Sequence, residues 1–125
     1  MILAVMADLM FSVQIIDQAK KLGLTVQFVK DEETAFGKLK SLPVQVVIFD
    51  LNYAAANPVG LLHRMKSDAE TKRIDTVGFI SHVQVELKRQ AEEAGCDVVV
   101  ARSAFAQKLP EILGRYAGNE TATLS

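Results

Sequence analysis

Short apolar runs alternate along the chain with segments whose apolar residues recur at helical spacing. The apolar runs cover residues 2–5, 24–29, 44–49, 76–80 and 98–100. The run 44–49 has almost no polar residue, which is typical of a parallel strand buried on both faces. These five runs predict five strands, with 44–49 as the central one.

Helical periodicity follows each run. The first helix is expected over 11–22, ended by Gly23, and the second follows Asp31, a residue suited to cap a helix. A loop over 52–60 precedes a third helix with an apolar face at 61–65. The fourth covers 83–94, and the last carries apolar residues from 105 to 116, with Pro110 in its first turn or at a kink.

Strands and helices that alternate through short connections indicate an α/β fold. We predict a single doubly wound, five-stranded parallel sheet with helices on both faces, which is a flavodoxin-like architecture. One domain is expected over residues 1–117. The remaining residues, 118–125, are small and polar, so we expect a flexible tail.

Composition narrows the classes of function. The chain has 125 residues and a formal net charge of −1, so its overall field favours neither nucleic acid nor an anionic membrane. One cysteine and two histidines supply neither a disulfide nor a zinc site. No apolar run reaches the length of a membrane span. We therefore expect a soluble, cytoplasmic protein.

Candidate chemistry lies just after the apolar runs, because ligands of an open parallel sheet bind beyond the carboxyl ends of its strands. Those positions hold Asp8, Asp50, Ser81 and Arg102. Taken singly, Ser81 suits a helix cap and Arg102 a solvated surface, while Asp50 suits a functional acid and a polar loop residue equally well.

Together these positions have a recognisable layout. The chain resembles the receiver domains of bacterial two-component response regulators (CheY-like) from about residue 2 to residue 116. The most specific stretches are Val46-Val47-Ile48-Phe49-Asp50, similar to the strand that ends in the phosphoacceptor, and Ala94-Gly95-Cys96-Asp97, similar to the turn before the fifth strand. The resemblance implies the fold that the periodicity predicts.

The resemblance also implies roles for individual residues. Asp50 stands at the phosphoacceptor position, Ser81 at the switch hydroxyl and Arg102 at the position of a lysine that contacts the phosphoryl group. The family binds Mg²⁺ with an acidic pair after the first strand, and Met6 and Ala7 stand at those positions here. Only Asp8, one residue further on, is acidic.

Further departures concern the switch. Val99 replaces an aromatic residue of the fifth strand, and arginine is no equivalent of lysine at position 102. We therefore interpret the chain as an atypical receiver, or pseudo-receiver, without a cofactor or an enzymatic activity. In this interpretation Asp50 bonds Ser81 or pairs with Arg102, and Met6 or Ala7 packs where a cation would lie.

Two alternatives stay open. In the first, Asp50 is phosphorylated and dephosphorylated autocatalytically, as part of a phosphorelay, with a weakened Mg²⁺ site that uses Asp8. In the second, the chain is a flavodoxin-like ligand-binding domain, although no glycine-rich phosphate loop follows any strand.

The expected partners are proteins: a histidine kinase, a regulator or a second copy of the chain. The family commonly binds partners through the fourth helix, fifth strand and fifth helix. Here that face would carry Glu86, Arg89, Gln90, Val100, Gln107 and Glu111. A homodimer through this face is compatible with the sequence but is not required by any residue.

Overall fold

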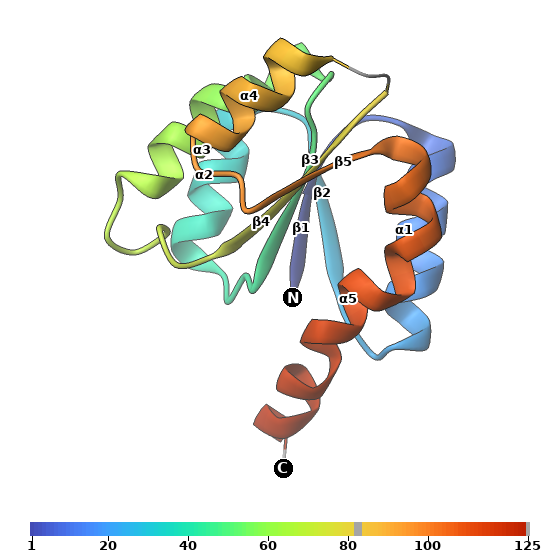
Figure 1. The fold of residues 1–125 in the computed structure, drawn as a ribbon. Helices are drawn as coiled ribbons and strands as arrows, with labels where there is room; N and C mark the ends of the chain where they lie inside the picture. The colour runs from blue at the N-terminus through green and yellow to red at the C-terminus, as the bar shows by residue number, and fades with distance from the viewer. Residues whose placement is uncertain (82–83, 125) are drawn as a thin grey trace.

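Five parallel strands form one twisted sheet in the order β2-β1-β3-β4-β5 (Figure 1). The computed structural model describes residues 1–81 and 84–124, with side chains as far as residue 118. The strands are β1 (Ile2–Val5), β2 (Val26–Val29), β3 (Val46–Asp50), β4 (Asp75–Ile80) and β5 (Val98–Ala101). The predicted five-stranded parallel sheet is confirmed.

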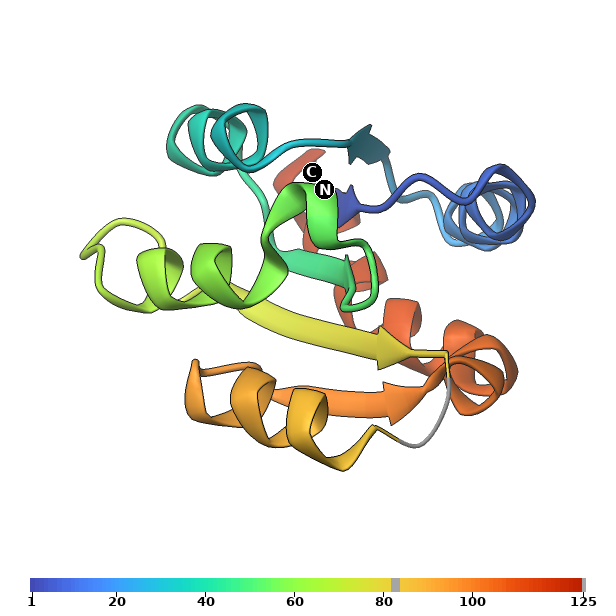
Figure 2. The same cartoon turned by 90° about the horizontal axis from the view of Figure 1, so that it is seen from above.

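Helices cover both faces of this sheet, as Figures 1 and 2 show. One face is covered by α1 (Leu9–Lys21) and α5 (Arg102–Leu124), the other by α2 (Glu32–Ser41), α3 (Pro58–Lys66) and α4 (Val85–Glu93). A short 3-10 helix, η1 (Ala54–Ala56), precedes α3. No helix in the described part of the chain is long and apolar enough to cross a membrane.

The two central strands explain the apolar runs. Every residue of β1 is buried, and β3 is buried from Val46 to Phe49. Alternate side chains of these strands enter the two cores on opposite faces of the sheet. Only the last residue of β3, Asp50, is partly exposed, which places a carboxyl group at the end of a buried strand.

Local signals set the ends of several helices. Asp31 caps α2 as predicted, since its Oδ1 accepts a hydrogen bond from the Thr34 N–H at 2.8 Å. Gly23 has a φ of +72° just after α1, and Gly95 has a φ of +105° just after α4. Both values lie in the left-handed region, where glycine is favoured.

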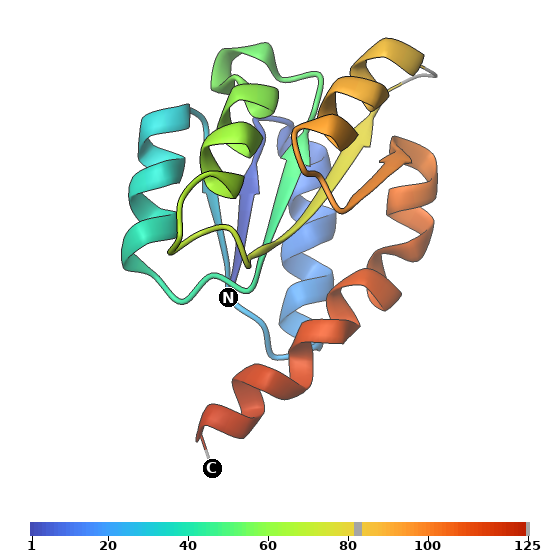
Figure 3. The same cartoon turned by 60° about the vertical axis from the view of Figure 1, so that its left-hand side comes forward.

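The starts of α3 and α5 differ from the sequence predictions. α3 begins at Pro58, inside the predicted loop over 52–60, because proline suits the first turn of a helix. α5 begins at Arg102, so Pro110 lies inside it and not in its first turn. Figure 3 shows α5 changing direction along its length, as expected where a proline removes a backbone hydrogen bond.

The start of α4 and the end of α5 also bear on the sequence predictions. The predicted start of the fourth helix, residue 83, lies outside the described residues, and α4 is described from Val85. α5 continues to Leu124, past residue 118, where we expected a polar tail to begin. The flexibility of that segment stays a prediction.

Candidate functional site

The carboxyl ends of the strands form the candidate site. β1 lies between β2 and β3 in the sheet. The connection after β1 leads to β2 on one side, and the connection after β2 returns to β3 on the other side. Crevices of open α/β sheets form at such a switch point. Asp8 follows β1, Asp50 ends β3, Ser81 follows β4 and Arg102 follows β5.

Asp8 is engaged through both carboxylate oxygens. Its Oδ1 accepts a hydrogen bond from the Phe11 N–H at 3.0 Å and caps α1. Its Oδ2 accepts a hydrogen bond from the Arg102 guanidinium. The Phe11 N–H and then Arg102 lower the pKa of Asp8, so this carboxyl group is charged at neutral pH. The Asp8–Arg102 pair joins the start of α1 to the start of α5.

The guanidinium group of Arg102 packs against aromatic rings of the core. Its guanidinium carbon lies 4.7 Å from the ring centroid of Phe11 and 5.8 Å from that of Phe79. Phe11 and Phe79 lie 5.0 Å apart in an edge-to-face arrangement, and Phe79 stacks on Phe105 at 5.1 Å. All three rings are buried. Arg102 is thus fixed by an ion pair and by the packing beneath it.

Asp50 has a different environment. Its Oδ1 accepts a hydrogen bond from the Asn52 N–H at 3.0 Å. Burial raises the pKa of Asp50 and nearby Asp8 raises it further, while the Asn52 N–H and Arg102 act in the opposite direction. Among the described residues, no direct bond joins Asp50 to Ser81 or to Arg102, so both contacts expected from the sequence are wrong in this structure.

Asn52 takes part in the contact that we expected of Asp50. Its side-chain oxygen accepts a hydrogen bond from the Ser81 N–H at 2.8 Å, and its amide nitrogen donates to the Gln84 side chain at 2.7 Å. Asn52 therefore ties the end of β3 to the segment after β4. One feature of the sequence indicates this role of Asn52: it lies two positions after Asp50, and its side-chain amide can both donate and accept a hydrogen bond.

At the expected metal position, the acidic side chain is that of Asp8, which is bonded to Arg102. Met6 is 1% exposed and packs in the core between the sheet, α1 and α5, whereas Ala7 is exposed. Mg²⁺ prefers an octahedral set of oxygen ligands, and here Asp8 is already bonded to Arg102. Within residues 1–81 and 84–124, no three His, Cys, Asp or Glu side chains gather closely enough to hold a metal ion.

The expected partner face lies around β5. On α4, Arg89 bonds both Glu86 and Glu93, and Gln90 donates to Glu86 at 3.2 Å. Val99 and Val100 of β5 are half-buried, and Val99 packs against the core beneath α4. Gln107 and Glu111 are exposed on α5. The predicted face thus lies on α4, β5 and α5, and its role in binding stays a prediction. Its six residues are Glu86, Arg89, Gln90, Val100, Gln107 and Glu111.

Asp50 leads to a pH-dependent prediction. We expect Asp50→Asn to raise the free energy of unfolding at pH 7 by up to about 1 kcal/mol, because it removes a half-buried charge and keeps an acceptor for the Asn52 N–H. The folded pKa is raised, so the wild type is best stabilised below the ordinary pKa of aspartate and loses that stability as pH rises through the folded pKa.

Urea unfolding of both proteins between pH 3 and pH 8 measures this difference. The gain of the variant is expected to vanish at the acid end and to grow with pH. A gain that is independent of pH would contradict the raised pKa.

Comparisons with known proteins place the fold. No protein-family model and no curated protein matches the chain. Solved structures do match: a response regulator from Hahella chejuensis at TM-score 0.81, with 17% identity, over 93% of this chain and 92% of that one. This chain has the receiver-domain fold.

Two further solved structures have the same fold as this chain. The receiver domain of the sensor histidine kinase PA1611 from Pseudomonas aeruginosa PAO1, which has a magnesium ion in its active-site cleft, matches at TM-score 0.79 and 17% identity, over 94% of this chain and 96% of that one. The chemotaxis response regulator CheY4 of Vibrio cholerae matches at TM-score 0.78 and 17% identity, over 91% and 95%. Identities this low establish the fold alone.

Proposed function

We propose that this chain is an atypical receiver-fold signalling domain that acts through protein contacts and not through a phosphorylation cycle at Asp50. The observation that carries the proposal is the Asp8–Arg102 pair. The acid nearest to the expected metal position caps α1 and binds Arg102, so neither residue is free for Mg²⁺ or a phosphoryl group.

The surroundings of the pair support the proposal. Phosphoryl transfer to a carboxylate needs a positive charge near the developing negative charge, usually a metal ion and a basic side chain. Asp50 lacks a direct bond to Arg102, and Met6 presents a buried thioether where the family has an acid. The residues present do not favour the transfer.

A single conformation then follows from the sequence. The Asp8–Arg102 pair, the aromatic rings beneath it and the Asn52–Ser81 hydrogen bond join α1, α5, β3 and β4 without any added group. The chain would present its surface to a histidine kinase, a regulator or a second copy in the cytoplasm. In this proposal it has no enzymatic activity and needs no cofactor.

Intact-mass measurement tests the proposal. The protein and its Asp50→Ala variant are incubated with acetyl phosphate and Mg²⁺, beside a receiver domain that is known to become labelled. We expect no phosphoryl adduct on either protein under conditions that label the reference domain. An adduct on the wild type that is absent from Asp50→Ala would overturn the proposal and establish the alternative, a phosphorylatable receiver that uses Asp50.

A further inference from the structure

The strand β5 forms one edge of the sheet, and none of its own residues is charged or a proline. It pairs with β4 alone, and in the described part of the chain no strand lies on its other side. Exposed edges are usually guarded by a lysine, a proline or a bulge, because their free N–H and C=O groups can pair with another chain. β5 reads Val-Val-Val-Ala and carries no lysine or proline.

The opposite edge of the sheet, β2, differs from β5. Its Gln27 side chain accepts a hydrogen bond from Lys38 Nζ at 2.6 Å, whereas the lysines near β5, Lys88 and Lys108, line its grooves. No residue of β2 is fully exposed. In β5, by contrast, Val98 and Ala101 are exposed. β5 is therefore the more exposed of the two edges.

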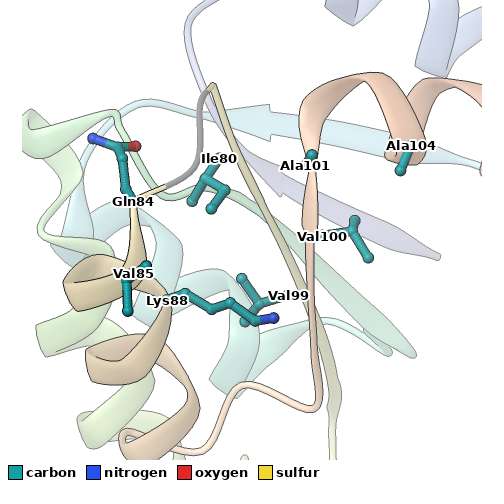
Figure 4. Close-up of a pocket in the computed structure, with 8 residues that line it drawn as sticks. All are labelled: Ile80, Gln84, Val85, Lys88, Val99, Val100, Ala101 and Ala104. Atoms are coloured by element: carbon teal, nitrogen blue, oxygen red, sulfur yellow. The ribbon is translucent and has the colours of Figure 1, made fainter.

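Grooves flank β5 on both faces of the sheet. A groove of about 400 Å³ lies between β5 and α4, where Val85, Val99 and Ala101 line it (Figure 4). A second groove, of about 240 Å³, lies between β5 and α5, lined by Val98, Val100 and Ile112. Figure 4 shows Val99 and Val100 pointing to opposite sides of the strand.

These two grooves suit an extended chain. Successive side chains of a strand point to opposite faces of the sheet, so a strand added beside β5 would place alternate side chains in the two grooves. Main-chain hydrogen bonds would supply affinity, and the apolar groove walls would select apolar residues at alternate positions. Val85 is 74% exposed and offers an uncovered apolar contact at one wall.

Charge defines the occupant further. Lys88 lines the first groove, and Lys108, Glu111 and Arg115 line the second. Three basic side chains against one acidic side chain favour an acidic segment. A second copy of this chain fits less well, because pairing two β5 strands would bring the same basic side chains of both copies together.

We propose that the β5 edge binds an extended, acidic segment of a partner protein as a sixth strand, with apolar side chains at alternate positions. This inference rests on the proposed function, since it assumes that the chain acts through protein contacts. It gives those contacts a specific form: main-chain pairing along Val98–Ala101 and two flanking grooves.

Peptide titration followed by nuclear magnetic resonance tests strand addition. The probe is the acetylated, amidated peptide Glu-Val-Thr-Val-Thr-Val-Asp. Its comparison peptide has the same side chains and N-methyl groups on alternate backbone nitrogens, which removes N–H donors. We expect saturable shift changes and slower hydrogen exchange at amides 98–101, and at least a tenfold loss of affinity with the N-methylated peptide. Equal affinities, or changes centred elsewhere, would overturn the inference.

Matched protein variants locate the site. Val98→Glu places a negative charge in the α5-side groove, and we expect it to weaken binding of the acidic peptide at least tenfold. Val13→Glu makes the same change on α1, where Val13 is 62% exposed, and should leave the affinity unchanged. Equal losses in both variants would contradict a site at β5. A peptide with lysines in place of its acids should bind less tightly, and tighter binding would overturn the charge argument.

Two further results separate this inference from the proposed function. No binding by any peptide, with no phosphoryl adduct in the mass assay, overturns strand addition alone. Binding by a protein that also takes up a phosphoryl group at Asp50 retains strand addition and overturns the proposed function. A concentration-dependent dimer formed through β5 without peptide would replace the acidic segment by a second copy.

Discussion

Phe79→Ala is expected to lower the free energy of unfolding by about 3–5 kcal/mol, the usual cost of removing a fully buried phenylalanine. Phe79 is 0% exposed on β4 and contacts the rings of Phe11 and Phe105. The truncation leaves a cavity between the sheet, α1 and α5, and it removes one of the two rings beneath Arg102. Since domains of this size are stable by about 5–15 kcal/mol, the loss is a large part of the total.

Urea unfolding followed by circular dichroism measures this loss. Phe36→Ala is the matched control, because Phe36 is a partly buried phenylalanine on α2 that also lies under an arginine. The guanidinium carbon of Arg64 lies 4.2 Å from the centroid of the Phe36 ring. We expect the control to cost less than half as much. Equal costs for the two variants would mean that the aromatic core under Arg102 has no special weight in stability.

Asp8→Ala has the second largest expected effect, a loss of about 2 kcal/mol. About 1 kcal/mol comes from the N-cap of α1, since removal of an aspartate cap leaves a helical N–H without its acceptor. The remainder comes from the ion pair with Arg102, whose partners are only about one-third exposed. The loss of the pair should also free the start of α5 to move relative to α1.

Asp8→Asn separates these two contributions. Asparagine caps helices about as well as aspartate, so this variant keeps the cap and loses the charge. Double-mutant cycles with Arg102→Ala then give the coupling energy of the pair alone. We expect Asp8→Asn to cost less than Asp8→Ala, and a coupling energy of zero would contradict the ion pair.

Acid unfolding gives an independent check of Asp8. The folded pKa of this carboxyl group is lowered, so its stabilising contribution is fully present above the ordinary pKa of an aspartate, near 3.9, and is lost as pH falls through the lower folded pKa. The stability difference between wild type and Asp8→Asn should therefore shrink in acid. A difference that grows in acid would contradict the lowered pKa.

The sequence was sufficient to predict the fold because each signal was local. The run from Val46 to Phe49 is buried on both faces, so its composition alone distinguishes it from an amphipathic strand. Asp31 caps its helix with its own side chain, a contact that spans three residues. The sequence pattern predicts a loop at Pro58, although proline is equally suited to the first turn of a helix, where the structure has it.

The site was harder to predict, because its contacts depend on distances between separate elements. The sequence predicts that Asp8, Asp50 and Arg102 lie at one edge of the sheet. It does not predict which of the two acids Arg102 binds. Ninety-four positions separate Arg102 from Asp8, and no periodicity encodes their contact. Asn52 was missed for the same reason, since Ser81 lies 29 positions away.

The positions of the two tyrosines have a spectroscopic consequence. The chain has no tryptophan, so its ultraviolet fluorescence comes from Tyr53 and Tyr116. Tyr116 donates a hydrogen bond to Asp75 at the start of β4, whereas Tyr53 follows β3, three residues after Asp50. A Tyr116→Phe variant would therefore contain one emitter, located beside the candidate site, and its emission would report events at that end of the sheet without an attached dye.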